Sequence, residues 1–340
     1  MLAPLRMDCQ APSASAHLVP AGETLVSTEA CFNRYRFERS YNIGGVSLRL
    51  QSASARDVDG GAELKQFASE KTDGEIEVEI RWVDEIPPTV AQTDFDSGAT
   101  WRLSRLGHEL VFEFTSPVIG AQPYKQLRVN RSFSRAELIL SRNALQGHKD
   151  FSVIEYPVSE LLVTNYLAHR GHGVELHGCG LIDAKTGGHL FLGHSGAGKS
   201  TTARLWQQLR GPEILSDDRI ILRLHDEELW MYGSPWHGEA AFASPTRAKL
   251  ERIHILQHGA ENRFSPFSRP RAIAEVFARS FPPFHSAVGL ERTVEFLKRT
   301  LETLPCYAFE FLPDHTSVDA VLAFRDLAFR DLTFHESRIS

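Results

Sequence analysis

The sequence predicts a β-rich N-terminal domain over residues 1–150, followed over residues 151–340 by an α/β domain with a phosphate-binding loop. Apolar and polar residues alternate in short segments between residues 30 and 145, which is typical of half-buried strands. Beyond Pro157, apolar segments, glycine turns and helical patterns alternate, which is typical of α/β domains. Residues 193–200 then match a phosphate-loop pattern.

The composition is that of a folded protein long enough for two domains. The 340 residues are 42% hydrophobic and 24% charged, with a formal net charge of −6. An ordinary apolar fraction and a small net charge exclude a mostly disordered chain. The mild acidity argues against binding to nucleic acid or anionic membranes, because such proteins usually carry a basic excess.

The sequence also lacks the features of membrane and secreted proteins. No run of about 18 apolar residues predicts a transmembrane helix. Pro4, Arg6 and Asp8 interrupt the first residues, which form no continuous apolar leader, so we expect a cytoplasmic protein. The four cysteines are widely spaced and form no CxxC pair, which predicts reduced thiols rather than disulfides or zinc ligands.

Alternating segments in the N-terminal domain predict half-buried antiparallel strands. They include residues 46–50, 76–82 and 101–103. Residues 109–114 follow the last of these across a glycine turn, which predicts a hairpin. This domain has no nucleophile–base pair and no metal-ligand spacing. Two interpretations of this domain therefore stay open: a docking or substrate-recognition module, and a structural cover.

The elements expected in the C-terminal domain follow in order. Pro157 fits the first turn of a helix that ends at Gly171. A glycine turn at His177-Gly-Cys-Gly leads to a strand over 189–192, and the helix after the phosphate loop ends at Gly211. The remaining expected elements are helices over 271–279 and 290–304, a strand over 307–311 and a terminal helix through the near-repeat at 322–331.

The strongest motif is GHSGAGKS at residues 193–200, which matches G-x-x-x-x-G-K-[ST]. Its glycines let successive backbone N–H groups face phosphate oxygens, and the following helix adds its positive N-terminal end. Lys199 brings a charge to the β- and γ-phosphates, and Ser200 offers a hydroxyl to Mg²⁺. With ATP and Mg²⁺ as expected cofactors, the binding residues are Gly193, His194, Ser195, Gly196, Ala197, Gly198, Lys199, Ser200 and Thr201.

Asp217 and Asp218 stand between two apolar segments downstream of this loop. One carboxylate at a strand end can hold hydrated Mg²⁺, which leaves the other available to accept the proton of an attacking hydroxyl. A solvated turn is the alternative for this pair. Upstream, His177 is a candidate to contact a phosphate or to tune the aspartates, and an ordinary turn histidine is the alternative.

Weaker candidates for an acceptor site follow at residues 233–247. Arg247 suits bidentate contact with a phosphate, and a plain surface arginine is the alternative. Trp236 and His237 are candidates to line an acceptor pocket, with a packed core tryptophan as the alternative for Trp236.

Taken in order, His177-Gly, the phosphate loop and Asp217-Asp218 resemble the catalytic domain of the HPr kinase/phosphorylase family over about residues 155–240. The resemblance implies an α/β phosphate-loop kinase fold shared with phosphoenolpyruvate carboxykinase. It also implies that His177, Lys199 and Asp217 act at the γ-phosphate, with Asp217 as the base. Asp218 and Ser200 would then serve Mg²⁺.

The chain departs from the family members that act on HPr. It has Thr201 where they usually carry Glu, and it lacks the basic, proline-containing signature used for HPr binding and dephosphorylation. Residues 233–247 are more similar to HPr-kinase-related proteins, a class that includes kinases of peptide hydroxyls. HPr is therefore not the expected acceptor, and phosphorylase activity is not expected.

The expected function is an ATP-dependent kinase that transfers the γ-phosphoryl group to a hydroxyl, above all a serine of a peptide or protein. A small-molecule kinase of the same fold is one alternative. A nucleotide-binding regulatory or scaffold protein with little catalysis is the other. No nucleic-acid or membrane partner is expected, and assembly into a homo-oligomer is left open.

Overall fold

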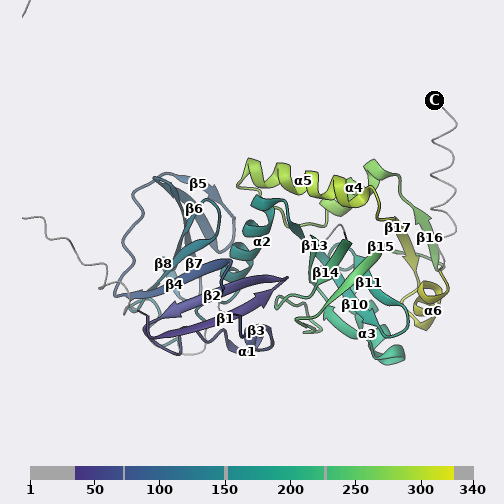
Figure 1. Ribbon diagram of the computed structural model, residues 1–340, viewed down its shortest axis with the longest axis horizontal. Coiled ribbons are helices and arrows are strands. Elements are labelled where there is room, and N and C mark those ends of the chain that lie inside the picture. The colour runs from purple at the N-terminus through teal and green to yellow at the C-terminus, as the bar shows by residue number, and fades with distance from the viewer. Residues whose placement is uncertain (1–34, 72, 149–151, 226–227, 325–340) are drawn as a thin grey trace, which may run out of the picture. The chain divides into compact units, whose positions relative to one another are not determined.

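The computed structural model describes residues 35–71, 73–148, 152–225 and 228–324, which contain two large β-sheets (Figure 1). The described residues, which begin at Tyr35, group into one unit by their contacts. None of the helices in the described ranges combines the length and the apolar character needed to cross a membrane.

The first sheet has nine strands in the order β3-β1-β2-β4-β9-β8-β7-β6-β5. These strands and the two short helices among them are β1 (Phe37–Ile43), β2 (Val46–Ser52), α1 (Gly61–Leu64), η2 (Lys65–Phe67), β3 (Ala68–Ser69), β4 (Ile76–Val83), β5 (Thr93–Asp96), β6 (Trp101–Leu106), β7 (Glu109–Ser116), β8 (Gly120–Asn130) and β9 (Arg135–Ser141). The hairpin predicted across Gly107 is confirmed as β6–β7. The expectation of antiparallel pairing is wrong for β4, which lies parallel to both β2 and β9.

The second sheet has eight strands, and five of its pairings close a ring, β11-β10-β13-β14-β15 and back to β11. Its strands are β10 (Gly173–Asp183), β11 (Gly187–Leu192), β12 (Glu213–Ser216), β13 (Arg219–His225), β14 (Glu228–Tyr232), β15 (Arg247–His258), β16 (Arg263–Pro266) and β17 (Cys306–Phe311). Only β11–β15 and β15–β17 pair parallel. The long strands β10 and β15 each pair with two neighbours in this ring. In addition, β10 pairs with β12 and β15 pairs with β17.

The predicted fold class, an α/β phosphate-loop kinase domain preceded by a β-rich domain, is wrong. Strands make up 41% and helices 23% of the described residues, and both halves of the chain are built on large mixed sheets. Alternating strand and helix patterns led us to expect parallel strands joined by helices. Instead, β13 lies antiparallel to β10 and also pairs antiparallel with β14, the next strand in sequence.

The glycine turn predicted at His177-Gly-Cys-Gly is also wrong, because β10 runs straight through it. A Cβ added to Gly178 would lie 2.6 Å from the Leu192 side chain, and one added to Gly180 would lie 2.6 Å from the Ile220 side chain. Glycine inside a strand often marks such a close approach of neighbouring groups. His177 consequently lies within the strand, opposite Arg219 of β13.

Five longer helices pack against these sheets, and several of their predicted ends are confirmed. They are α2 (Val158–Arg170), α3 (Lys199–Arg210), α4 (Arg269–Phe277), α5 (Ala287–Leu301) and α6 (His315–Ala323). Gly171 and Gly211 end α2 and α3 in the left-handed conformation. Trp206 of α3 is buried in a core with Phe191 and Phe309, and burial of a large apolar side chain stabilises the fold by about 2 kcal/mol.

The cysteine prediction is confirmed where the structure describes it. Cys179 and Cys306 are buried free thiols. Cys9 and Cys31, and the part of the near-repeat beyond residue 324, lie outside the described residues.

Candidate functional site

The phosphate loop, residues 193–198, connects β11 to α3. Gly198 is the N-cap of α3 with φ +100°, and a Cβ there would lie 2.5 Å from the Phe311 ring. The Ala197 N–H donates to the His194 carbonyl at 3.0 Å and tightens the turn. His194, Ser195 and Gly196 are exposed at its top. The loop thus presents accessible backbone at the positive end of a 12-residue helix.

Lys199 lies beneath the loop and is only 6% exposed. Its Nζ donates to the carbonyls of Gly193 at 3.0 Å and of His194 at 3.2 Å. Burial lowers the pKa of this ammonium, and attraction to Asp218 and Asp217 offsets part of that effect. The ammonium is therefore held against the loop by two carbonyl acceptors, and no carboxylate of the described residues forms an ion pair with it.

Asp217 follows β12 and contacts the phosphate-loop helix. The Ser200 Oγ donates to Asp217 Oδ2 at 3.1 Å. The backbone N–H groups of Gly238 and Ala240 donate to Oδ1 and Oδ2 at 3.0 and 3.1 Å. A Cβ on Gly238 would lie 2.8 Å from Oδ2, so only glycine fits this approach. The loop and the aspartate pair, separate in sequence, are thereby joined.

Asp218 binds His177 of the neighbouring strand β10 and the adjacent residue Arg219. Its Oδ1 accepts from His177 Nε2 at 2.9 Å, and its Oδ2 accepts from Arg219 Nε at 2.9 Å. Burial alone would raise the pKa of Asp218, but hydrogen bonds from His177 and Arg219 outweigh it and hold this pKa at about 2. Asp218 is thus ionised at neutral pH, which favours the His177 tautomer with its proton on Nε2.

Arg219 extends the cluster to two glutamates, the buried Glu175 and the partly buried Glu160. Its guanidinium binds Glu160 and Glu175 and lies 3.7 Å from the centroid of the Phe281 ring. Burial and the neighbouring Glu160 raise the pKa of Glu175 well above its usual value, and burial also raises the pKa of Glu160. This glutamate pair therefore holds a proton at a higher pH than an exposed pair would.

Arg219 also lines a pocket of about 190 Å³. Its polar lining includes Glu160, Glu175 and Arg219, and its aromatic lining includes Phe281 and Trp101. Arg219 both lines this pocket and forms an ion pair with Asp218. The pocket therefore adjoins the aspartate pair.

The weaker sequence candidates lie in different places. His237 is exposed and precedes Gly238, whose N–H binds Asp217, so it belongs to the same loop. Arg247 instead donates to the Tyr232 hydroxyl at 2.9 Å and lies over the Trp230 ring. Trp236 is buried and donates to Ser159 at 3.0 Å, which confirms the core alternative.

Several residues of the site carry no motif that predicts them. His258, at the end of β15, contacts the Gly196 carbonyl at 3.1 Å. Arg279 lowers the pKa of His194 by charge repulsion, and its carbonyl accepts the His177 N–H at 2.7 Å. Arg219 directly follows the aspartate pair, which was a usable signal. His258 and Arg279 come from distant elements with no local motif.

The oxygen donors at the loop suit Mg²⁺ better than a transition metal. Within the described ranges, no group of three or more His, Cys, Asp or Glu side chains could hold a metal ion. Mg²⁺ at a nucleotide needs fewer protein ligands, because waters and phosphate oxygens complete its shell. The adjoining Ser200 hydroxyl and Asp217 carboxylate fit that requirement.

No protein-family model matches the chain, and no curated protein matches it.

Proposed function

We propose that this chain is an ATP-dependent, Mg²⁺-dependent kinase that transfers the γ-phosphoryl group to a serine hydroxyl of a peptide or protein. The observation that carries the proposal is the 3.1 Å contact between Ser200 and Asp217. It joins a phosphate-loop motif to an acidic pair, the two components that phosphoryl transfer to a hydroxyl requires. The order of His177, the loop and the aspartates, which resembles the HPr kinase/phosphorylase family, adds support.

Binding of the triphosphate would rest on the loop and the start of α3. The N–H groups of the exposed loop and the helix end attract phosphate oxygens. Lys199 would exchange its two carbonyl acceptors for the β- and γ-phosphates. Ser200 and Asp217 would hold Mg²⁺, which when bound neutralises charge on these phosphates.

We assign proton transfer to the His177–Asp218 pair. As the acceptor oxygen bonds to the γ-phosphorus and the bond to ADP breaks, the hydroxyl proton passes to His177 Nδ1. Asp218 then stabilises the imidazolium through Nε2, the arrangement that a carboxylate–histidine pair provides elsewhere. The sequence-based assignment of Asp217 as base and Asp218 as metal ligand stays a prediction. The Ser200–Asp217 contact favours the exchanged roles.

The acceptor would enter through the pocket beside Arg219. Its aromatic walls suit the side chains around a peptide serine, and Arg219 links it to Asp218. Glu160 and Glu175 fix the guanidinium of Arg219, so this wall of the pocket is pre-organised.

The test measures transfer from γ-labelled ATP to a library of serine peptides and to free serine, together with Mg·ATP affinity. Asp218→Asn should leave the affinity within about three-fold and reduce transfer by at least ~100-fold. Asp217→Asn should weaken Mg·ATP binding by at least ~10-fold. Asp319→Asn, an exposed change on α6, is the matched control and should alter neither.

Two outcomes would count against the proposal. Binding of Mg·ATP without transfer to any acceptor would indicate a regulatory nucleotide-binding protein instead. The second outcome is that Asp218→Asn transfers normally, while Asp217→Asn still binds Mg·ATP but no longer transfers the phosphoryl group. This result would restore the sequence-based roles, with Asp217 as the base and Asp218 as the metal ligand.

A further inference from the structure

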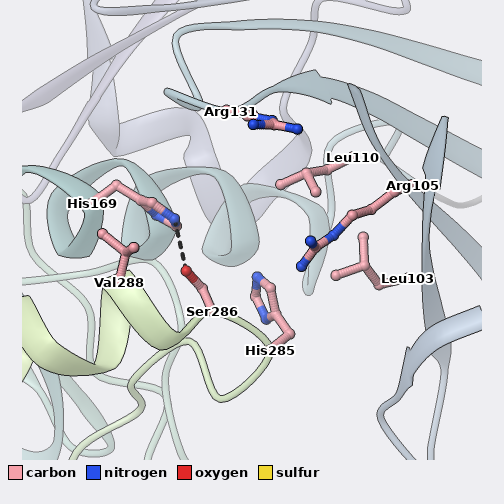
Figure 2. A pocket seen from close by; sticks show the side chains of 8 residues that line it. All are labelled: Leu103, Arg105, Leu110, Arg131, His169, His285, Ser286 and Val288. Carbon is pink, nitrogen blue, oxygen red and sulfur yellow. Dashed lines mark hydrogen bonds between the residues drawn. The ribbon is translucent and has the colours of Figure 1, made fainter. Parts of the chain in front are cut away.

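A second pocket, of about 280 Å³, lies between the β6–β7 hairpin and the start of α5 (Figure 2). The residues that line it are Leu103, Arg105, Leu110, Arg131, His169, His285, Ser286 and Val288. It shares His285 with the pocket beside Arg219, and its lining contains two arginines, two histidines and no acidic side chain.

The two arginines give the pocket its charge. Arg105 extends from β6 toward His285, and Arg131, just beyond β8, lies across the pocket from it (Figure 2). Arg105 pairs with Asp94 at 2.9 Å. Arg131 forms no ion pair within the described part of the chain and is exposed. At least one guanidinium is therefore available to an anion.

Further polar groups border the same space. The Nε2 of His285 is buried and has no hydrogen-bond partner among the described residues. Ser286 caps α5 by accepting from the Gly289 N–H, and a hydrogen bond with His169 at 3.0 Å fixes its hydroxyl (Figure 2). The first N–H groups of α5, before that of Gly289, have no acceptor inside the helix. A helix start that borders a basic pocket adds to its attraction for anions.

The remaining wall is apolar. Leu103 and Arg105 are two residues apart on β6 and share one face of the strand, and Leu110 pairs with Arg105 across the hairpin. Val288 adds an aliphatic side chain from α5. A ligand that satisfies this pocket therefore needs an aliphatic part as well as a negative charge.

We propose that this pocket binds a small organic anion, a carboxylate or phosphate group on a short aliphatic chain. The oxyanion lies between Arg105 and Arg131 within reach of His285, and the aliphatic chain packs on Leu103, Leu110 and Val288. Guanidinium groups bind both oxyanions in the same bidentate manner.

Calorimetric titration of the full chain with hexanoate, hexyl phosphate, inorganic phosphate and hexanol tests this site. Hexanoate or hexyl phosphate should bind, and the tighter of the two identifies the oxyanion. Arg105→Gln and Arg131→Gln should each weaken that binding by about ten-fold. Arg102→Gln should not, because Arg102 lies on the opposite face of the same strand and pairs with Asp96.

A second readout keeps the test independent of folding defects. The Trp101 ring lies 5.9 Å from the His285 ring and also lines the pocket beside Arg219, so occupancy of the second pocket should change Trp101 fluorescence in the unmodified chain but not in Arg131→Gln. Mg·ATP affinity should stay normal in Arg131→Gln. The proposal is overturned if neither hexyl anion binds at millimolar concentration, if hexanol or inorganic phosphate binds as tightly, or if Arg131→Gln binds like the unmodified chain.

Discussion

Three histidines, His189, His254 and His285, are held in their neutral form by the fold. Burial lowers the pKa of His189 and of His285 to about 4. Burial also places the pKa of His254 well below its usual value. Its ring lies among aromatic rings, including Phe191 and Phe264, and neither ring nitrogen has a partner within the described residues.

These histidines predict a loss of stability in mild acid. In the unfolded chain each has a pKa near 6.5, so between about pH 6.5 and 4 the unfolded state binds protons that the folded state excludes. Their contribution is complete above pH 6.5 and is lost as the pH falls. For His189, the shift of the pKa from 6.5 to about 4 corresponds to about 3 kcal/mol of folding stability, lost once the pH has fallen to about 4.

His254→Phe should therefore flatten the pH dependence. Phenylalanine suits the aromatic surroundings and removes two unpaired nitrogens, so the variant should match the unmodified chain at pH 7 and exceed it at pH 5. Urea unfolding at the two pH values measures this, with exposed His108→Phe as the control. An unchanged or steeper acid loss in His254→Phe would contradict the explanation.

At this scale the sequence predicted residues with a motif and missed those without one. Lys199 and Ser200 were found because phosphate chemistry restricts their spacing. Glu160 and Glu175 were missed because buried carboxylates carry no sequence signal until Arg219 is placed between them.

At the scale of elements, the junction between the loop and α3 depends on Gly198. Its φ of +100° is a conformation that other residues adopt only with strain, and the Phe311 ring leaves no room for a Cβ. This single residue therefore sets the direction of the helix end beneath the phosphate loop.

Gly198→Ala should lower the free energy of unfolding by about 1–3 kcal/mol and reduce ATP affinity by more than ~10-fold. The matched control is Gly187→Ala, where φ is +78° but no atom lies within 4 Å of the added Cβ. Gly187→Ala should also lower the free energy of unfolding, because of its positive φ, but should leave ATP affinity unchanged. Denaturant unfolding and nucleotide titration measure both, and equal nucleotide affinities in the two variants would refute the role of Gly198.

Elements with local end signals were predictable. Gly171 and Gly211 mark the ends of α2 and α3 in sequence as they do in the structure. The path of β10 was not predictable, because Gly178 and Gly180 look like a turn until the side chains of Leu192 and Ile220 are seen to occupy the space beside them.

At the scale of the whole molecule, strand pairing across long sequence separations decides the fold. Glu77 of β4 pairs with Arg135 of β9, and Ile253 of β15 pairs with Cys306 of β17. Such pairing depends on packing between distant segments rather than on local propensity. Local patterns therefore identified several strands, such as β4, β6 and β7, but led to the wrong fold class.

The claim on which the account depends most is that the phosphate loop, Lys199 and the Ser200–Asp217 pair together bind Mg·ATP. Isothermal titration calorimetry of the full chain with ATP, with and without Mg²⁺, tests it directly. We predict binding that Mg²⁺ strengthens and that Lys199→Met weakens by at least ~100-fold, while Lys185→Met, an exposed change, leaves it intact. No binding, or equal binding by the unmodified chain and Lys199→Met, would contradict the account.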